Sequence, residues 1–335
     1  MGTAAEGSVD IHTHILPREL PPWAERFGDA GFVQVEPIEG GCLRMMRGGK
    51  PFREVKQNCW DPARRIDECD RFGVGVQVLS TIPVMFNYAA KPEHTDDVAR
   101  FLNDHIACIV HDHPTRFAGL GTLPLQDPDR AVAELERCMS IGLRGVEIGS
   151  HVNAWNLSAP ELFPVFQAAE RLGAAVFVHP WDMMGQERMQ RYWLPWLVGM
   201  PAESSLAICS LIFGGVLERL PKLRIAVAHG GGAFPGTIGR IEHGFACRPD
   251  LVAIDNPRSP REYLGRFYVD SLVHDPTALR AIIDLFGADR VALGTDYPFP
   301  LGESEPGKLI ASCNFPEELR AQLLRHTALD WLGAR

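Results

Sequence analysis

The sequence contains three histidines and an aspartate whose spacing could bind a metal ion. His12 and His14 stand two residues apart in DIHTH, so on a β-strand both side chains would point to the same side. His179 in VFVHP and Asp296 in LGTDYP each end another apolar run. Three imidazoles and one carboxylate suit Zn²⁺ or a similar divalent ion with one position open for water. The alternative is a set of hydrogen-bonded histidines without a metal.

A further histidine, His229 in VAHGGG, also ends an apolar run. The glycines that follow it would let the backbone or a ligand approach closely. His229 could be a fifth metal ligand or a base beside a metal-bound water. The HGGG segment also resembles the oxyanion-hole segment of some esterases, but the sequence contains no GxSxG nucleophile elbow, so a serine hydrolase is not expected.

The elements that must position these residues alternate along the chain. Short runs rich in Val, Ile, Leu and Ala are each followed by turn residues and then by a longer amphipathic stretch. The expected strands are residues 9–15, 74–81, 118–125, 144–151, 174–179, 224–229, 267–273 and 291–296. The expected helices include residues 62–72, 96–111, 129–141, 159–172, 202–220 and 276–286. This alternation predicts an α/β fold with a parallel sheet, and the count of eight strands predicts a (β/α)₈ TIM-type barrel.

Several of the strand runs are almost entirely apolar until their last residues. The polar side chains at these ends are His14, Thr81, His151, His179, His229 and Asp296. Catalytic groups of a (β/α)₈ barrel lie at the C-terminal ends of its strands, so these positions mark the expected functional edge. A doubly wound open sheet would alternate in a similar way, but no GxGxxG motif follows the first run, so a dinucleotide-binding fold is not expected.

The fourth run, residues 144–151, bears on the number of metal ions. A second metal in barrels of this type usually needs a bridging group, often a carboxylated lysine on the fourth strand. No lysine lies in residues 144–151. We therefore expect a single metal ion.

Two segments interrupt the alternation. Residues 17–61 form an insertion after the first strand, in which Gly48 and Gly49 could turn a small hairpin. Residues 183–200, after the fifth strand, hold three aromatic residues among charges and show no clean period. Long insertions at a catalytic rim are commonly lids or substrate pockets. We expect residues 1–335 to form a single metal-dependent barrel domain that carries the first insertion.

Composition and charge argue against several kinds of partner. The chain has 33 basic and 42 acidic residues, a net charge of -9, and no run of Lys or Arg that could neutralise a phosphate backbone, so we expect no nucleic-acid partner. The longest apolar stretch, residues 206–217, is too short to span a bilayer, and the first residues lack a secretory or transit pattern. Eight cysteines without a CxxC pair read as buried thiols. A cytosolic protein without a membrane partner is expected.

Longer motifs accompany the candidate ligands, namely NCWDP, TIPVMF, HPWDMM, WLPWLVGMPAE, VAHGGGAFP and LGTDYPFPLGE. On these motifs the sequence resembles the amidohydrolase superfamily and, within it, the branch of metal-dependent nonoxidative decarboxylases. HxH alone is found across the superfamily, whereas HPWDMM with WLPWL and TDYPFPLGE is specific to this branch. The resemblance runs from residue 9 to about residue 333.

This resemblance implies an activity and a metal site. It implies one Zn²⁺ per subunit, no organic cofactor, and removal of one carboxylate from an acyclic semialdehyde of tryptophan catabolism, which limits quinolinate formation. The family's metal ligands match His12, His14, His179 and Asp296. The histidine that activates the metal-bound water matches His229. As a mechanistic hypothesis, Asp296 also relays a proton to the carbon beside the departing carboxylate.

The resemblance further implies residues that bind the small carboxylate substrate. One arginine for a substrate carboxylate matches Arg53 in GGKPFREV. A second matches Arg240 in TIGRIEH, which in the family reaches the active site of the partner subunit of a homodimer. An aromatic wall of the pocket matches Trp193 in RYWLPWL. Arg47 stands where a relative has a lysine, which makes it a further candidate.

Two other functions remain open at this point. The first is a metal-dependent hydrolase of a related acidic lactone or amide, because the same metal-activated water would serve that reaction. The specific HPWDMM and TDYPFPLGE motifs argue against it. The second is a catalytically silent zinc-binding barrel, against which the intact set of metal ligands and His229 argues.

Overall fold

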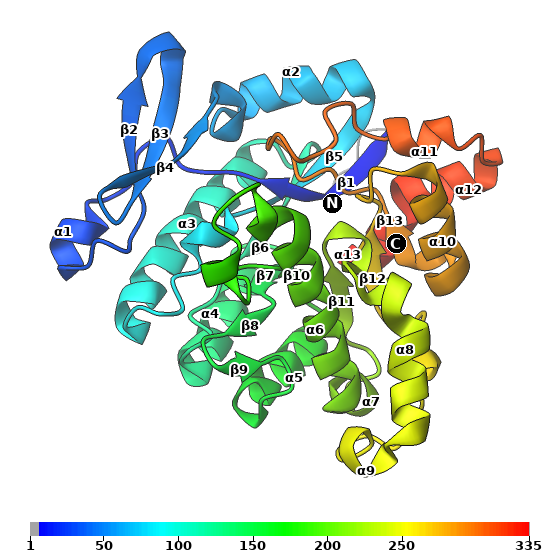
Figure 1. Cartoon of the computed structure of the whole chain (residues 1–335). Coiled ribbons are helices and arrows are strands. Elements are labelled where there is room, and N and C mark those ends of the chain that lie inside the picture. Colours follow the sequence, from blue (N-terminus) through cyan, green and yellow to red (C-terminus); the bar gives the residue numbers. More distant parts are fainter. Residues whose placement is uncertain (1–6, 335) are drawn as a thin grey trace.

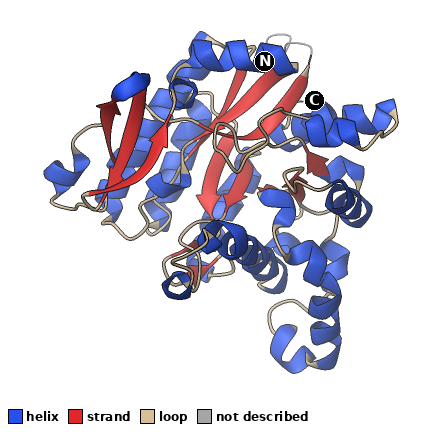
Figure 2. Cartoon of the chain, turned by 45° about the horizontal axis from the view of Figure 1, so that its top comes forward, coloured by secondary structure: helices blue, strands red, loops and turns tan. Residues whose placement is uncertain are grey.

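The computed structural model describes residues 7–334 of the chain. Within these residues eight parallel strands lie side by side in chain order (Figures 1 and 2). They are β1 (Ser8–His14), β5 (Val74–Ser80), β6 (Phe117–Gly121), β7 (Gly145–Gly149), β10 (Ala175–His179), β11 (Arg224–Val227), β12 (Tyr268–Asp270) and β13 (Val291–Ala292). Each overlaps one of the predicted runs, and helices surround the sheet. The predicted α/β barrel of the TIM type is therefore confirmed.

Backbone hydrogen bonds beyond the last regular strand close the barrel. The His14 N–H donates to the carbonyl of Tyr297 at 2.7 Å, and the Asp296 N–H donates to the carbonyl of His12 at 2.9 Å. The predicted run at 291–296 is therefore longer than β13 itself, because its last residues turn into the barrel mouth. The same two backbone hydrogen bonds therefore close the barrel and place Asp296 beside His12 and His14.

Helices cover the outside of the barrel. Those at predicted positions are α2 (Pro62–Phe72), α3 (Pro92–Asp112), α4 (Pro128–Ser140), α5 (Phe163–Leu172), α6 (Met200–Phe213), α7 (Val216–Arg219) and α10 (Pro276–Phe286). The prediction of one helix over 202–220 is wrong, because Gly215 adopts a left-handed φ of 68° and separates α6 from α7. The remaining helices are α1 (Trp23–Phe27), α8 (Phe234–Cys247), α9 (Pro249–Val252), α11 (Lys308–Ser312), α12 (Glu317–Ala321) and α13 (Thr327–Leu332).

The barrel interior is filled by small apolar side chains from alternate strand positions, including several alanines and valines. Phe177 of β10 stands in the middle of this interior. Its ring packs against Trp331 of α13, 6.0 Å between centroids, and against His12, 4.8 Å between centroids. Phe177 therefore forms the apolar floor on which the polar barrel mouth is built.

The insertion at 17–61 contains α1 and an antiparallel sheet of β2 (Gln34–Ile38), β3 (Cys42–Arg47) and β4 (Lys50–Val55). Arg47 pairs with Lys50 across Gly48 and Gly49, whose φ angles of 60° and 71° suit a tight hairpin turn, so the predicted hairpin is confirmed. In Figure 1 this sheet stands beside the barrel at the upper left. Two short strands, β8 (His151–Val152) and β9 (Trp155–Asn156), form a second small hairpin at the barrel rim.

One helical stretch of the described chain, Pro195–Phe213, is long and apolar enough in composition to cross a membrane. Half of its most apolar window is buried inside the protein, and its α6 part contacts β10 and α8. These apolar side chains therefore contribute to the core. The eight cysteines are free thiols, as predicted, but only four of them are buried: Cys42 and Cys209 are partly buried, and Cys108 and Cys247 are exposed.

We expect His105 on α3 to make the stability of the protein depend on pH. Burial lowers its pKa to about 4, below an unfolded value of roughly 6.5. The unfolded state therefore binds the proton more tightly, and stability is lost as the pH falls from about 6.5 towards 4. Replacing His105→Gln should reduce this loss by roughly 2 kcal/mol, measured by urea unfolding at pH 4.5 and 7.5.

The matched control is His111→Gln, which changes an exposed histidine of the same helix. It should leave the pH dependence of unfolding as in the wild type. An equal pH dependence in the wild type and the His105 variant would contradict the prediction.

Candidate metal centre

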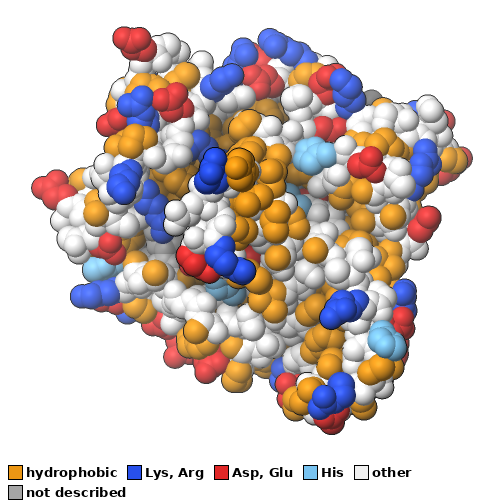
Figure 3. Space-filling view, in the orientation of Figure 1, with side chains coloured by type: hydrophobic (Ala, Val, Ile, Leu, Met, Phe, Trp, Pro, Cys, Tyr) orange, Lys and Arg blue, Asp and Glu red, His pale blue; other side chains and the backbone are white. Residues whose placement is uncertain are grey.

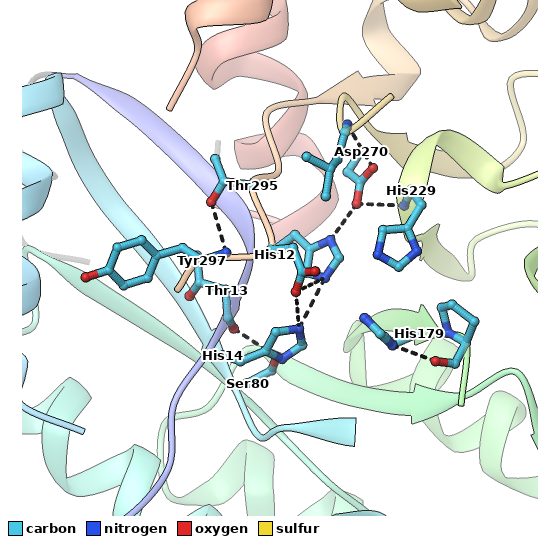
Figure 4. A network of polar contacts seen from close by, with 12 residues as sticks. His12, Thr13, His14, Ser80, His179, His229, Asp270, Thr295 and Tyr297 are labelled. Atoms are coloured by element: carbon cyan, nitrogen blue, oxygen red, sulfur yellow. Dashed lines mark hydrogen bonds and ion pairs between the residues drawn. The ribbon is translucent and has the colours of Figure 1, made fainter. Parts of the chain in front are cut away.

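The four predicted ligands come together at the C-terminal edge of the barrel. His12 and His14 project from β1, His179 ends β10, and Asp296 follows β13. Their ligand atoms all lie within 4.8 Å of one another. The Nε2 atoms of His12 and His14 are 3.2 Å apart, and Asp296 Oδ1 lies 3.1 Å from His14 Nε2 (Figure 4).

The second nitrogen of each ligand histidine is held by an acceptor that cannot itself donate a proton. These acceptors are Asp270 Oδ2 for His12 Nδ1 (2.6 Å), the Thr81 carbonyl for His14 Nδ1 (2.8 Å) and the Pro180 carbonyl for His179 Nδ1 (2.9 Å). Each hydrogen bond places the proton on Nδ1 and leaves a lone pair on Nε2. Three such lone pairs and a carboxylate would repel one another at these distances, so this donor set needs a cation.

The protonation states agree with this reading. Burial would raise the pKa of Asp296, but the hydrogen bond with His14 and the surrounding histidines hold it well below its usual range, so the carboxylate is ionised. Burial would lower the pKa of His14, but the Glu147 and Asp296 carboxylates raise it, so without a metal ion His14 also carries a proton on Nε2, directed at Asp296. A divalent ion would take the place of that proton. Burial and the neighbouring histidines lower the pKa of His179, so its ring is neutral. Neutral imidazole and ionised carboxylate are the forms that bind a metal. The residues present therefore fit a single divalent ion.

Asp270, at the end of β12, was not singled out from the sequence. It is fully buried, and its Oδ2 accepts from His12 Nδ1 and from the His229 N–H at 2.9 Å, while Oδ1 accepts from the Gly230 N–H at 2.8 Å. Burial would raise the pKa of Asp270, but the hydrogen bond from His12 lowers it. Asp270 thus fixes a ligand and the turn that carries His229. The available signal was a single carboxylate within the otherwise largely apolar predicted strand 267–273.

His229 lies beside the ligand group and not in it. Its φ is 58°, and its ring centroid is 5.2 Å from that of His12 and 5.1 Å from that of His179. The four-residue ligand group found among residues 7–334 does not include it. Its Nδ1 is buried without a hydrogen-bond partner there, and burial lowers its pKa to about 4. Of the two roles left open, a neutral proton acceptor therefore fits better than a fifth ligand.

A buried carboxylate, Glu147 of β7, lies behind His14. Its Oε1 is 3.7 Å from His14 Nδ1, and neither carboxylate oxygen has a hydrogen-bond partner within residues 7–334. Burial raises the pKa of Glu147 to about 8. Sequence reasoning considered only a lysine on this strand and missed this group. Glu147 does not join the ligand group in the described chain.

Two pockets meet at the ligand group, and Asp296 lines both. The larger has a volume of about 590 Å³ and is lined by His229 and by apolar side chains such as Leu272, Ile282 and Leu285. The smaller, of about 30 Å³, carries the cationic and aromatic groups described next. A substrate at the metal would therefore contact apolar side chains in the larger pocket and cationic and aromatic side chains in the smaller one.

The smaller pocket contains two of the predicted substrate residues. Arg53 of β4 is half-buried there, with its guanidinium carbon 4.2 Å from the centre of the Phe299 ring. Its guanidinium makes no hydrogen bond or ion pair within the described chain, and packs against the Phe299 ring instead. Burial lowers the pKa of Arg53, although the charge of Asp296 opposes that effect. Trp193 lines the same pocket and is 43% exposed.

The other two predicted substrate residues lie elsewhere in this chain. Arg47 is exposed, its Nε donates to the Gly31 carbonyl at 3.3 Å, and its guanidinium carbon lies 5.9 Å from the centre of the Trp181 ring. Arg47 lines a separate polar pocket, with Trp181 between that pocket and the metal. Arg240 is exposed on α8, and its guanidinium makes no hydrogen bond or ion pair within residues 7–334.

The chain belongs to the amidohydrolase family, since the family model described as Amidohydrolase matches residues 9–334. Within that family it is similar to two enzymes named 2-amino-3-carboxymuconate-6-semialdehyde decarboxylase. The one from Dictyostelium discoideum is 56% identical over 327 residues, which cover 97% of this chain and 91% of the relative. The one from Caenorhabditis elegans is 39% identical over 381 aligned positions, and the alignment covers 98% of this chain and 95% of the relative.

A solved structure shows the same fold. The 5-carboxyvanillate decarboxylase LigW from Sphingomonas paucimobilis matches with a TM-score of 0.81 and 26% identity, over 98% of this chain and 99% of that one. Together the relatives confirm the resemblance drawn from the motifs and identify the chain as a decarboxylase, a carboxy-lyase. The family and the donor set make the site a divalent-metal centre.

We expect Asp270→Asn to weaken metal binding by roughly 10- to 100-fold. An asparagine amide would put an NH₂ group where the carboxylate now accepts N–H donors on both oxygens, so either His12 or the turn at His229 would lose its partner. The measurement is competition for the metal with a chromogenic chelator. Asp275→Asn, which retains a good N-cap on α10, is the control and should bind the metal normally. Equal affinity in both variants would disprove the role of Asp270.

Proposed function

We propose that this decarboxylase uses zinc to convert 2-amino-3-carboxymuconate 6-semialdehyde to 2-aminomuconate 6-semialdehyde in the kynurenine pathway of tryptophan catabolism, which limits quinolinate formation. The main support for this proposal is the 56% identity, over 97% of this chain, to a relative that is named for that substrate. Three imidazoles and one carboxylate are a donor set that zinc favours. Eight free thiols suit a reducing compartment, so we place the enzyme in the cytosol.

When bound, zinc would supply Lewis acidity that lowers the pKa of a water molecule to about 7. The neutral ring of His229 would accept the proton of that water, because burial keeps the ring unprotonated at physiological pH. Asp296, open to both pockets, would relay the proton taken up by His229 to the carbon beside the departing carboxylate. The electron pair of the C–C bond that breaks as CO₂ leaves would form the new C–H bond with that proton.

Arg53 would bind a carboxylate of the substrate. Its guanidinium faces the pocket shared with His14 and His179 and has no anionic partner within the described chain. A half-buried guanidinium binds a carboxylate more strongly than an exposed one, because the pair is poorly screened and the planar donors match both oxygens. Trp193 would limit access of water to that contact.

The function is tested with zinc-loaded protein and the semialdehyde. We expect loss of its near-UV absorbance together with release of CO₂, and in His229→Asn a fall in kcat on the order of 100-fold or more with zinc still bound. His111→Asn is the matched control and should retain full activity. Bleaching without CO₂ would instead indicate a hydrolase, and wild-type turnover in the His229 variant would exclude His229 as the base.

We further propose a homodimer in which Arg240 acts in trans. The guanidinium of Arg240 is exposed on α8, and Pro235 and Gly236 of the same helix line the larger pocket. Large exposed apolar side chains include Leu197 and Val198. Figure 3 shows hydrophobic side chains gathered over the segment that joins β10 to α6. A second copy of the chain would cover this surface and bring a cation to the pocket.

Mixing two inactive variants tests this arrangement. If Arg240 acts in trans, a dimer of one His229→Asn subunit and one Arg240→Ala subunit contains one complete site. Co-expression of the two variants should then restore roughly a quarter of the wild-type activity at random pairing. If Arg240 acts within its own subunit, the mixed dimer has no complete site and activity should stay at the level of the single variants.

A further inference from the structure

Helix α2 carries an arginine that the chemistry above does not use. Arg65 has no exposed surface, although arginine is almost never fully buried unless it is paired. It makes no ion pair within residues 7–334. Its guanidinium instead donates to neutral acceptors, namely the His14 carbonyl from Nη1 (2.7 Å), the Asn58 carbonyl from Nη1 (3.2 Å), Gln77 Oε1 from Nε (3.1 Å) and Thr13 Oγ1 from Nη2 (3.1 Å).

Two of these acceptors belong to the ligand-bearing part of β1. Thr13 stands between the two ligand histidines, and its hydroxyl accepts from Arg65 while donating to the Val78 carbonyl of β5 at 2.8 Å. The His14 carbonyl accepts from the same guanidinium. Arg65 therefore fixes the backbone and side-chain direction of β1 at the point where His12 and His14 turn inward.

The same helix also contacts the segment that carries the fourth ligand. The guanidinium carbon of Arg65 lies 4.7 Å from the centre of the Tyr297 ring. The Tyr297 hydroxyl donates to Glu68 Oε2 at 2.6 Å, one helical turn after Arg65. Tyr297 directly follows Asp296, whose backbone has a left-handed φ of 56°. Figure 4 shows Tyr297 and Thr13 on the same side of the ligand group.

Glu68 is itself held in place. Its Oε2 accepts from Asn58 Nδ2 at 3.0 Å, and its Oε1 accepts from Arg64 Nε at 2.8 Å. The hydrogen bonds to Glu68 lower its pKa, against the effect of burial, so it remains an acceptor for Tyr297. The side chain of Tyr297 is thus held between the Glu68 carboxylate, which accepts from its hydroxyl, and the Arg65 guanidinium, which lies against its ring.

We propose that Arg65 and Glu68 are positioning residues of the metal centre, which hold β1 and the Asp296–Tyr297 segment at the separation that zinc binding requires. The proposal rests on the proposed function only for the identity of the metal. A holding device is needed because the four ligand atoms must be kept within 4.8 Å of one another before the metal binds. Arg suits the task because its planar donors point in fixed directions to several acceptors at once.

Metal binding measured without substrate tests the proposal. Arg65→Lys keeps the positive charge and loses the planar donor set, and Tyr297→Phe removes only the hydroxyl that Glu68 accepts. We expect each variant to bind zinc roughly 10-fold or more weakly in chelator competition, and to change the visible absorption of the Co²⁺-substituted protein. Should Arg65→Lys fail to fold, Tyr297→Phe carries the test.

Arg116→Lys is the matched control. Arg116 donates to the carbonyls of Gly75 and Val74, at the opposite end of β5, so it contacts strand backbone far from the ligands. Replacing Arg116 by lysine should lower the midpoint of urea unfolding, and should leave the zinc affinity and the absorption spectrum of the Co²⁺-substituted protein unchanged. Wild-type zinc affinity and spectrum in Tyr297→Phe, or an equal loss of affinity in Arg116→Lys, would overturn the proposal. A wild type that binds zinc but does not release CO₂ would contradict the proposed function alone.

Discussion

Electrostatic repulsion among the metal ligands is the constraint on which the site depends. Three imidazole lone pairs and an ionised carboxylate converge in a buried barrel mouth, where the low dielectric strengthens repulsion as well as attraction. Buried acceptors fix the tautomer of each histidine, and the fold must hold the set together without the ion. A bound metal ion would replace repulsion among these ligand atoms with attraction to the cation.

The same constraint explains how an acidic protein can bind an acidic substrate. The net charge of -9 would repel a polycarboxylate over the whole surface. At the site, however, the anionic groups Asp270 and Asp296 are already engaged with histidines, whereas Arg53 has no anionic partner in the described chain. With the proposed metal bound, Arg53 and the cation would make the local potential positive, which would favour the carboxylate of the proposed substrate.

Part of this site could be predicted from sequence because strand geometry is local. The two-residue spacing of His12 and His14 placed both on one face, and apolar runs that end in a polar residue placed His179 and Asp296 at the same barrel edge. The substrate residues came from family resemblance alone. No local pattern shows where the hairpin of Arg47 lies relative to the barrel, and the structure places Arg47 at a separate pocket, so its role stays a prediction.

Other features depend on contacts that the local sequence pattern does not encode. Asp270 bonds His12 across 258 positions, and no local pattern encodes that partner. Helix α8 contains three glycines, which lower its helix propensity, so the sequence pattern does not predict it. In the structure Phe234 and Ile238 of this helix are buried, and their packing stabilises it. The split at Gly215 lies within a continuous apolar period, so only the left-handed backbone reveals it.

The barrel closure joins residues from the two ends of the chain. Thr295 Oγ1 donates to Asp10 Oδ2 at 2.6 Å across 285 positions, beside the backbone bonds that set Asp296 against HxH. Three of the four ligands are synthesised well before the last strand, yet they have no complete donor set until that strand docks. Tight metal binding therefore requires that the last strand has been synthesised and has docked. A product that ends before Asp296 lacks the carboxylate that completes the site.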